Sequence, residues 1–357
     1  MTTSPEIDPK TPELMQRLVG DIAAVGGLRL CAIGDELGLF TDLAKNGPAT
    51  SEELAARTGL NERYLREWIY GTSIAGYLEF DKASRKVSIP AAHIPVLADE
   101  CGPMFLGGTL NMVNDMLKPY NRVIESFRRG GGVNYDEYDD SMWQNLQRHS
   151  CVRYKNLLIQ QWMPEMPDIA ARLSAGGTLA DFGCGAGGST VEMAKAFPQA
   201  RLYGFDLVPD NIEIARKKAE DAGVADRVDF QLYDLSAQGA PDQFDVIATF
   251  DLIHDMADPQ GGLNALRKAV KDDGFYILMD VTCEDDPADN DGPMAVFKFC
   301  ASLHYCMTTS LANDGVGLGT CGLPESRVNE YCKKAGFSSV RRLPVEHPMN
   351  VLYEVRP

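Results

Sequence analysis

The chain has no apolar run that approaches the ~20 residues needed to cross a bilayer as a helix. Its first ten residues are polar and lack the apolar core of a secretory signal. Basic residues are scarce as well, because 34 Lys and Arg stand against 51 Asp and Glu and leave a formal charge of −17. Nucleic-acid binding depends on clustered Lys and Arg, so we expect no nucleic-acid partner. These absences predict a cytoplasmic protein that does not bind membranes.

Cysteine occurs nine times, but no C-x-x-C pair of the kind found in structural metal sites is present. We therefore expect no bound metal. An odd number of scattered cysteines favours free thiols in a reducing compartment. The remaining composition, 45% hydrophobic and 24% charged residues, is ordinary for a globular protein, and 357 residues are enough for two domains.

The most informative stretch, 178–190, reads T-L-A-D-F-G-C-G-A-G-G-S-T. A short apolar run ends at Asp181, and a helical pattern continues from Val191. Between them lie three glycines at alternate positions: Gly183, Gly185 and Gly187. This order predicts a strand, a glycine-rich turn and a helix, which open a nucleotide-binding α/β domain. Glycines allow a ligand to lie against the backbone, and the N–H groups that begin the helix favour an anionic group.

Apolar runs alternate with helical patterns from residue 201 to 281, which predicts a parallel sheet covered on both faces. Each run ends at an acidic residue: Asp206, Asp234, Asp251 and Asp280. Ligands of such sheets bind at the carboxyl ends of the strands. Asp234 and Asp251 can alternatively cap the helices that follow them. Two last runs, 338–343 and 350–355, predict a closing pair of strands.

Two families compete for this pattern. Gly183, Gly185 and Gly188, with Asp206 downstream, fit the fingerprint of NAD-binding proteins. The pattern Asp181-x-Gly-x-Gly-x-Gly187, together with the closing strand pair, instead resembles class I S-adenosylmethionine-dependent methyltransferases. This resemblance implies a Rossmann-like α/β domain whose mostly parallel sheet has a terminal antiparallel strand. It also implies S-adenosyl-L-methionine as cofactor and S-adenosyl-L-homocysteine as product.

The resemblance assigns cofactor roles to particular residues. Asp206 would bind the ribose hydroxyls, Asp234 and Leu235 the adenine, and Phe250 would lie beside the methionine portion. Cys184 would serve as a small residue next to the ligand rather than as a nucleophile. The expected cofactor-binding set is Asp181, Gly183, Cys184, Gly185, Gly187, Asp206, Leu207, Asp234, Leu235 and Phe250.

The N-terminal third contains two short helical patterns, 51–58 and 62–75, and then a two-stranded ribbon over 77–89. This order predicts a winged helix-turn-helix. Such a module binds DNA through its second helix, but here Arg63 and Arg66 are matched by Glu62 and Glu67. We therefore favour a dimerisation module. Residues 22–89 also resemble the winged-helix dimerisation domain of small-molecule O-methyltransferases, which implies a homodimer.

We expect a winged-helix domain over 1–98, a helical connector or lid over 99–170 and the methyltransferase domain over 171–357. Gly130–Gly132 in the connector could be the hinge of a lid or part of an ordinary surface loop. A long insert, 282–322, is rich in Met and aromatic residues and could cover an acceptor pocket or simply form helix core. The candidate acceptor-binding residues are Tyr135, Tyr138, Met256, His304 and Met307.

The segment that begins His254-Asp255 resembles the His-Asp-x-x-Asp segment of winged-helix O-methyltransferases. The resemblance makes His254 the general base, and an imidazole with an ordinary pKa near 6.5 is largely neutral at pH 7. Asp280 matches the acid that orients this histidine. The second flanking carboxylate of the family falls near Arg327, with Glu325 close by, which leaves the triad incomplete. His254 could alternatively be structural.

We expect transfer of a methyl group from S-adenosylmethionine to a small molecule, with oxygen as the expected nucleophile and nitrogen or sulfur left open. Two other functions remain as alternatives. One is a regulator that senses S-adenosylmethionine or a metabolite without turnover. The other is an NAD-dependent oxidoreductase, which has no need of the closing strand pair.

Overall fold

The computed structural model describes residues 8–357, so most of the polar segment 1–10 lies outside the described residues. The chain forms two compact units that divide between Asn114 and Asp115. The predicted connector 99–170 extends across this division and stays a prediction as a separate domain. Within residues 8–357, no helix combines the length and the apolar composition that crossing a bilayer requires.

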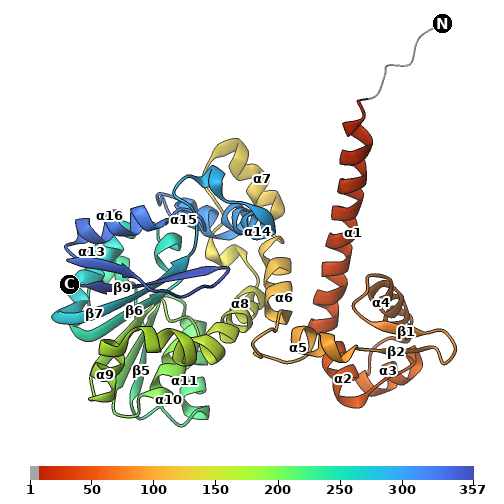
Figure 1. The fold of residues 1–357 in the computed structure, drawn as a ribbon, viewed down its shortest axis with the longest axis horizontal. Coiled ribbons are helices and arrows are strands. Elements are labelled where there is room, and N and C mark those ends of the chain that lie inside the picture. Colours follow the sequence, from red (N-terminus) through yellow and green to blue (C-terminus); the bar gives the residue numbers. More distant parts are fainter. Residues whose placement is uncertain (1–7) are drawn as a thin grey trace, which may run out of the picture. The chain divides into compact units, whose positions relative to one another are not determined.

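The first unit contains the predicted helices and ribbon (Figure 1). Its elements are α1 (Lys10–Glu36), α2 (Leu39–Asn46), α3 (Ser51–Thr58), α4 (Glu62–Ile74), β1 (Glu79–Asp81), β2 (Lys86–Ser88), η1 (Ala91–His93), α5 (Ile94–Leu97) and α6 (Gly107–Met116), which crosses the division. A capping box begins α3, because Thr50 and Glu53 each accept the other's backbone N–H, at 3.2 and 2.9 Å. The side chain of Asn61 caps α4. Both caps lie at the starts of the helical patterns that the sequence predicted.

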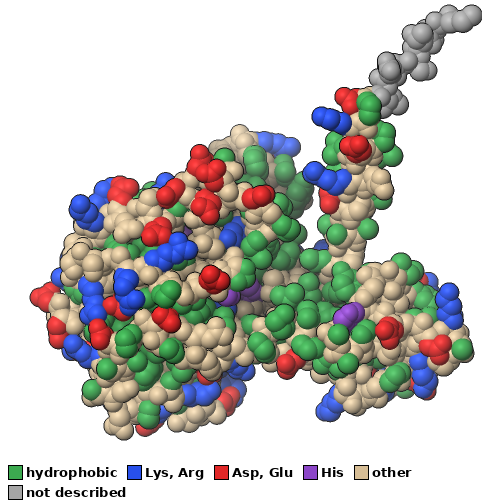
Figure 2. All heavy atoms as spheres, in the orientation of Figure 1, with side chains coloured by type: hydrophobic (Ala, Val, Ile, Leu, Met, Phe, Trp, Pro, Cys, Tyr) green, Lys and Arg blue, Asp and Glu red, His purple; other side chains and the backbone are tan. Residues whose placement is uncertain are grey.

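Helix α1 is packed against other residues of the first unit near its C-terminus, whereas its N-terminal half is exposed. Near its C-terminus, a Cβ on Gly34 would lie 2.6 Å from the rings of both Phe40 and Trp68. Trp68 also donates to the carbonyl of Leu30 at 2.8 Å. The N-terminal half instead carries large apolar side chains that are 49–72% exposed (green in Figure 2): Leu14, Met15, Leu18, Val19, Ile22 and Val25. Because they recur every three or four residues, they form one stripe.

The second unit is built on a seven-stranded sheet. Its strands are β3 (Thr178–Phe182), β4 (Arg201–Asp206), β5 (Val228–Leu232), β6 (Phe244–Phe250), β7 (Val270–Val281), β8 (Ser339–Arg342) and β9 (Asn350–Arg356). They lie in the order β5-β4-β3-β6-β7-β9-β8, and β9 alone runs antiparallel to its neighbours. This arrangement confirms the predicted Rossmann-like sheet. Asn350 pairs with Val281, so the start of β9 lies at the carboxyl edge of the parallel strands.

Helices cover both faces of this sheet (Figure 1). One face holds α9 (Pro167–Ser174), α10 (Gly188–Ala196) and α11 (Pro209–Asp221), and the other holds α12 (Leu235–Gln238), α13 (Pro259–Ala269) and α16 (Glu325–Ala335). Burial on both sides explains why the strands are apolar runs rather than alternating patterns.

Two helical segments complete the unit. Before the sheet come α7 (Tyr120–Arg129), η2 (Tyr135–Glu137), α8 (Asp140–Arg153), η3 (Tyr154–Trp162) and η4 (Met163–Glu165). The insert between β7 and α16 forms η6 (Pro287–Asp289), α14 (Gly292–Ala301), η7 (Ser302–Cys306) and α15 (Met307–Ala312). Both η3 and η7 are π-helical, a local conformation that is frequent at functional sites.

Candidate active site

The loop between β3 and α10 has left-handed backbone at three glycines. Gly183, Gly185 and Gly187 have φ angles of 70°, 53° and 73°, which side chains with a Cβ rarely adopt. A Cβ on Gly187 would lie 2.6 Å from the Phe230 ring, whereas a Cβ on Gly185 would meet nothing within 4 Å. Gly187 is therefore needed for packing, and Gly185 faces open space in which a ligand could approach the backbone.

The side chain of Cys184 packs against β4 and supports this loop. Its side chain is 7% exposed, and its sulfur would lie 3.0 Å from a Cβ on Gly204 in β4. Burial raises the pKa of this thiol well above its usual value, with the charge of Asp181 adding to the effect. A buried, protonated thiol is a poor nucleophile, in line with the expected role of Cys184 as a small residue.

Asp181 in β3 is fully buried, and only one of its two carboxylate oxygens accepts hydrogen bonds. Its Oδ2 accepts hydrogen bonds from Ser189 Oγ at 2.5 Å and Thr190 Oγ1 at 2.7 Å, both in α10. Its Oδ1 has no hydrogen-bond partner among the described residues. Burial raises the pKa of Asp181 to about 6, and the charge of Asp206 adds to the shift. A buried acceptor without a donor is costly, so Oδ1 is suited to a donor that arrives with a ligand.

Asp206 ties the glycine loop to the end of β4. Its Oδ2 accepts the Gly185 N–H at 2.8 Å, and its Oδ1 accepts from Val208 N at 2.9 Å and Asn211 Nδ2 at 3.1 Å. Burial raises the pKa of this carboxyl. Oδ2 retains a lone pair for a further donor. Leu207, the next residue, is 56% exposed.

The remaining cofactor candidates lie along the same edge. Tyr233 N donates to Asp206 O at 2.8 Å, which places Asp234 beside Asp206. Asp234 caps α12 through Oδ1, as the alternative interpretation held, and its Oδ2 makes no contact in that cap. Leu235 is buried below it. Phe250, at the end of β6, is also buried and packs edge-on against Tyr154, with ring centres 5.6 Å apart.

A buried histidine with two carboxylates lies at the neighbouring strand ends. His254 belongs to η5 (Ile253–Asp255), which follows β6, and its side chain is 3% exposed. Its Nδ1 lies 2.6 Å from Asp280 Oδ1 at the end of β7, and its Nε2 lies 3.2 Å from Asp255 Oδ1. The expected contact with Asp280 is thus present. We refer to His254, Asp255 and Asp280 as the buried trio.

The second carboxylate beside His254 is not the one that the resemblance indicated. Glu325 forms an ion pair with Arg342 at 2.8 Å, and Arg327 donates to the carbonyl of Gly322. Asp255 takes this place because η5 is a single 3-10 turn, which brings the carboxylate next in sequence back to the imidazole. The motif contained the residue, but the sequence alone did not indicate the turn.

The two carboxylates of the trio act on the pKa of the histidine between them. Burial by itself favours a neutral imidazole, but the charges of Asp280 and Asp255 outweigh it and raise the pKa of His254 well above its usual value. Burial also raises the pKa of Asp255, which the charge of His254 opposes. The two carboxylates therefore favour the protonated form of His254 relative to an isolated imidazole.

An ion pair behind the trio was not predicted from the sequence. Asp251, between β6 and η5, has a φ of 55° and forms an ion pair with Arg153 at 2.9 Å. Asn350 accepts from Arg153 at 3.1 Å and donates to Asp251 Oδ1 at 2.6 Å. Asp251 therefore does not cap the following helix, which corrects that alternative. The contacts instead hold the turn that carries His254 against α8 and β9.

Tyr154, the residue after Arg153, connects this network to the glycine loop. Its ring would lie 3.1 Å from a Cβ on Gly188 and packs against Phe250. Burial raises the pKa of its hydroxyl. Arg153 thus contacts the turn that carries His254, and its neighbour Tyr154 contacts the glycine loop.

Aromatic residues from the connector and the insert pack beside Asp255. The rings of Tyr135, Tyr138 and Trp143 each lie 5.7–6.2 Å from that of Tyr305 in η7. Burial raises the pKa of Tyr135 and Tyr305, and the charge of Asp255 contributes in both cases. Two of the predicted acceptor-site residues, Tyr135 and Tyr138, are therefore next to the trio, whereas Trp143 and Tyr305 were not predicted.

The segment that leads to these tyrosines is tightly packed. A Cβ on Gly132 would lie 1.8 Å from the Thr308 carbonyl oxygen, and Val133 N donates to Thr308 Oγ1 at 3.0 Å. Tyr138 Oη donates to His304 O at 2.5 Å. The third glycine of the triple is thus a packing requirement, and this segment lies against the insert.

The other acceptor candidates lie at different places around the insert. The His304 ring stacks on Tyr120 in α7 with centres 6.4 Å apart, and burial lowers its pKa. Met307 packs against Gly319. Met256 is buried after η5, and its carbonyl accepts from Ser310 at 3.1 Å. Of these three, only Met256 adjoins the trio directly in the chain.

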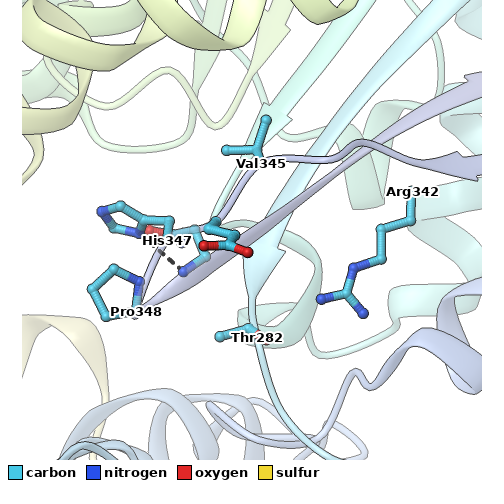
Figure 3. A pocket seen from close by; sticks show the side chains of 7 residues that line it. Thr282, Arg342, Val345, His347 and Pro348 are labelled. Carbon is cyan, nitrogen blue, oxygen red and sulfur yellow. Dashed lines mark hydrogen bonds between the residues drawn. The ribbon is translucent and has the colours of Figure 1, made fainter.

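A cavity of about 330 Å³ opens at the same edge of the sheet. It lies between the end of β7 and the loop from β8 to β9, with Arg342 opposite His347 and Pro348 (Figure 3). Asn350 lines it and also contacts Asp251 and the Asp280 carbonyl. The cavity is therefore separated from the trio by Asn350.

A metal could in principle be held by one cluster in this unit. His254, Asp255 and Cys306 offer ligand atoms that all lie within 4.8 Å of one another. Coordination requires a thiolate, but burial raises the pKa of Cys306 to about 12. The expectation that no metal is bound at this cluster stays a prediction.

Comparisons with known proteins agree with this architecture. Residues 25–99 match the family model described as an Rv2258c-like winged HTH domain, and residues 173–310 match a methyltransferase domain. The chain carries a methyltransferase domain behind a winged-helix domain. The glycine loop and the buried trio both lie within the matched residues 173–310.

Relatives are similar over part of their length. A ubiquinone biosynthesis O-methyltransferase of Cereibacter sphaeroides is 35% identical over 114 residues, which are 31% of this chain and 44% of that enzyme. The 27-O-demethylrifamycin SV methyltransferase of Amycolatopsis mediterranei is 27% identical over 164 residues, 44% of this chain and 60% of that enzyme. The chain thus spans less than two thirds of these relatives.

Solved structures share the whole fold at low identity. The mitomycin 7-O-methyltransferase MmcR has a TM-score of 0.71 at 19% identity, over 98% of this chain and 100% of that one. Human N-acetylserotonin methyltransferase in complex with SAM has a TM-score of 0.71 at 18% identity, over 99% of each chain. At this identity the likeness shows the fold.

Proposed function

We propose that the chain transfers a methyl group from S-adenosylmethionine to an oxygen atom of a small molecule and releases S-adenosylhomocysteine. One observation carries the proposal. The glycine loop has open space above Gly185 and an unpartnered Asp181 Oδ1, and Tyr154 and Arg153 join it to a buried histidine with two carboxylates. A ligand loop and a proton-transfer group thus share one edge of the sheet.

The residues at the loop fit this cofactor. Asp206 can accept from the ribose hydroxyls, and Asp234 and Leu235 would contact the adenine. Asp181 Oδ1 suits the ammonium group of the methionine portion, which Phe250 would flank. When bound, the cofactor supplies a methyl group that its sulfonium has already activated, so the protein has to position the acceptor and exclude water.

The acceptor side of the proposal rests on the trio and its aromatic neighbours. A hydroxyl loses its proton when it is methylated, and the trio is a buried group of titratable side chains at this edge. The rings of Tyr135, Trp143 and Tyr305 provide an apolar surface beside Asp255. We therefore infer a small molecule with at least one hydroxyl on an apolar framework.

An enzyme is favoured over a DNA-binding regulator by the charges on α4. Arg63 pairs with Glu67 at 2.5 Å and Arg66 with Glu62 at 3.2 Å, all on one helix. Cations that are neutralised by their own helix contribute little to phosphate binding. The apolar stripe of α1 further supports the proposal that the winged-helix domain forms a homodimer, which would cover that stripe.

The dimer can be tested separately from the chemistry. Ile22→Asp places a charge in the centre of the stripe, where Ile22 is 72% exposed. We expect sedimentation velocity to give half the mass of the unmodified protein. Arg17→Gln, on the same helix but outside the stripe, should leave the mass unchanged. A monomeric unmodified protein would refute the dimer. The cytoplasmic location of the protein also remains a proposal.

Calorimetric titration with S-adenosylhomocysteine, and with NAD as control, tests the proposed cofactor. We expect micromolar affinity for the first and none for the second. A screen of hydroxylated small molecules, with mass spectrometry of the products, then tests turnover. Binding of NAD alone would overturn the proposed function. Cofactor binding without turnover on any acceptor would favour the sensing regulator.

A further inference from the structure

Lys298 in α14 is a buried cation that the proposed chemistry does not use. It is 6% exposed, and its Nζ donates to the carbonyl of Thr282 at 2.6 Å. In the described part of the chain it forms no ion pair with a carboxylate. An ammonium has three N–H donors, so two of them lack a protein acceptor. Burial accordingly lowers the pKa of Lys298, because its charge is not balanced by a close partner.

The carbonyl that holds Lys298 belongs to a wall of the cavity of about 330 Å³, since Thr282 lines it. His347 lines another wall, and the charge of Lys298 contributes, after burial and Arg153, to the lowering of the His347 pKa to about 4. Two lining residues thus place the ammonium beside the cavity. Arg342 supplies a second cation, and its side chain extends toward Thr282 from the side opposite His347 (Figure 3).

His347 offers this cavity a neutral donor. Its Nδ1 accepts the backbone N–H groups of Met349 and Asn350 at 3.3 and 3.2 Å, so the ring proton is on Nε2. Asn350, in contrast, has no donor left. Its Nδ2 donates to Asp251 Oδ1 at 2.6 Å and to the Asp280 carbonyl at 3.5 Å. Asn350 therefore closes the cavity toward the trio and is not itself available to a ligand.

Two carboxylates limit what the cavity can hold. Glu325 pairs with Arg342 at 2.8 Å, but a guanidinium has five N–H donors and keeps others free. Glu346 lines the cavity and is exposed, so it repels a negative charge at the rim and not in the interior. The remaining walls at Val345 and Pro348 are apolar. The volume equals that of about ten water molecules of ~30 Å³ each, which is enough for a small metabolite.

We propose that this cavity is a second small-molecule site, which takes a compact molecule with one carboxylate or phosphate group. The oxyanion accepts hydrogen bonds from Lys298 and Arg342, and the uncharged part of the molecule lies on Val345 and Pro348. Such a ligand balances the buried ammonium, which the protein leaves without a partner of opposite charge. The site does not rest on the proposed function, because no methyl donor takes part in the binding.

Nuclear magnetic resonance of the full-length protein, labelled with ¹⁵N-histidine, detects binding and locates it. The chain has five histidines, and the signal absent from His347→Gln identifies the ring in the cavity. The probes are butanoate, inorganic phosphate and butanamide, the uncharged analogue of butanoate, at one ionic strength. We expect the His347 signals to shift with at least one oxyanion, with a Kd on the order of 1 mM, as for a fragment of few atoms.

The comparison of butanoate with phosphate shows which oxyanion the site prefers, and butanamide should cause no shift. Three results would overturn the proposal. One is the absence of any shift with both oxyanions. Another is an equal response to butanamide, which would remove the role of the charge. The third is a shift of the His254 signals in place of those of His347, which would put the anion at the trio.

Lys298→Met retains most of the side chain and removes the ammonium. We expect it to raise the Kd of the preferred oxyanion by about 10-fold or more, as for the loss of a charged hydrogen bond. Lys333→Met is the matched control, because Lys333 is an exposed lysine of α16 outside the cavity lining. This control should leave the Kd within about twofold. An unchanged Kd in Lys298→Met would contradict the site.

Two exposed lining residues test the site even if Lys298→Met does not fold. Arg342→Gln removes the second cation and should raise the Kd by about fivefold, less than Lys298→Met because its side chain is 52% exposed. Glu346→Gln removes the repulsion at the rim and should lower the Kd by about two- to fivefold. Opposite signs at two residues of one lining cannot arise from a general loss of structure, which circular dichroism monitors. The same Kd in both variants would overturn the proposal.

A last titration separates this site from the proposed active site. Butanoate added to protein saturated with S-adenosylhomocysteine should still shift His347, with its Kd changed by less than about twofold. Displacement of S-adenosylhomocysteine by butanoate would place the oxyanion in the cofactor site and would overturn the second site. Protein that binds an oxyanion at His347 but does not bind S-adenosylhomocysteine would support the second site, and the failure would be that of the proposed function alone.

Discussion

The loop after β3 and the turn after β6 leave the same edge of the sheet, and each contains left-handed backbone. The loop obtains this conformation from glycines, at Gly183, Gly185 and Gly187. The turn obtains it at Asp251, a residue with a side chain, whose φ of 55° is held by an ion pair with Arg153 and a hydrogen bond from Asn350. One segment thus depends on the absence of side chains, and the other on contacts between them.

This difference follows from what each segment has to do. A ligand that lies against backbone needs space and N–H groups, which glycine provides locally. Proton transfer needs a side chain in a fixed orientation, and the strain of its turn has to be offset by contacts from elsewhere. We therefore expect substitutions to disturb the loop by adding side-chain atoms and the turn by removing contacts.

The largest effect is expected at the turn. Arg153→Met removes the positive charge beside Asp251 and leaves the carboxylate with Asn350 as its neighbour. Breaking a buried pair from one side costs about 3–5 kcal/mol, and we expect about 3 because the Asp251 side chain is 23% exposed. Urea denaturation followed by circular dichroism measures the change. The double variant Arg153→Met/Asp251→Asn should recover part of the loss, and equal stability of the single and double variants would show that the pair is not coupled.

Within the loop, two glycines separate folding from binding. Gly187→Ala adds a Cβ at a φ of 73°, 2.6 Å from the Phe230 ring, and should lower the free energy of unfolding by roughly 2–3 kcal/mol. Gly185→Ala meets nothing within 4 Å, so it should cost about 1 kcal/mol of stability for its φ alone while weakening S-adenosylhomocysteine binding. Denaturation and calorimetry on both variants test this separation. An equal loss of stability in the two variants would contradict it.

A smaller effect, of opposite sign, is expected at Asp181. Its pKa is about 6 in the folded protein and near 3.8 when unfolded. Between these values the folded state binds more protons, so ionising Asp181 costs stability as the pH rises, about 3 kcal/mol in full. Asp181→Asn removes this cost but leaves an amide N–H unpaired, which lowers the gain in stability by about 1 kcal/mol.

We therefore expect Asp181→Asn to be more stable than the unmodified protein by about 2 kcal/mol at pH 8. The advantage should vanish as the pH falls from 6 to 4, because Asp181 then becomes protonated. Thermal denaturation across this range measures the difference, and affinity for S-adenosylhomocysteine should fall in the same variant. A constant difference across pH would mean that Asp181 does not titrate in this range.

Local patterns were sufficient to predict the sheet and the glycine loop. The apolar runs of β3 to β7 are buried on both faces, and the capping signals of α3 and α4 lie within a few residues of each helix start. The Asp280 contact of His254 followed from the family resemblance, because His254 follows β6 and Asp280 lies near the end of the neighbouring strand β7.

The contacts that set the chemistry could not be predicted in this way. Arg153 and Asn350 are 197 residues apart, and no periodicity relates a residue of α8 to the start of β9. The position of Tyr305 depends on the π-helical turn of η7, for which the sequence has no recognised signal. Asp255 was present in the motif, but its approach to Nε2 depends on how one 3-10 turn closes.

The insert from η6 to α15 is continuous in the chain, and it leaves the sheet after β7 and returns before α16. It supplies Tyr305 and Cys306, two of the groups around Asp255, while no strand pairing of β3 to β9 depends on it. Under the proposed function, we therefore expect substitutions confined to this segment to change acceptor preference more than cofactor affinity. The same property makes the insert the natural segment to exchange between related chains when a different acceptor is wanted.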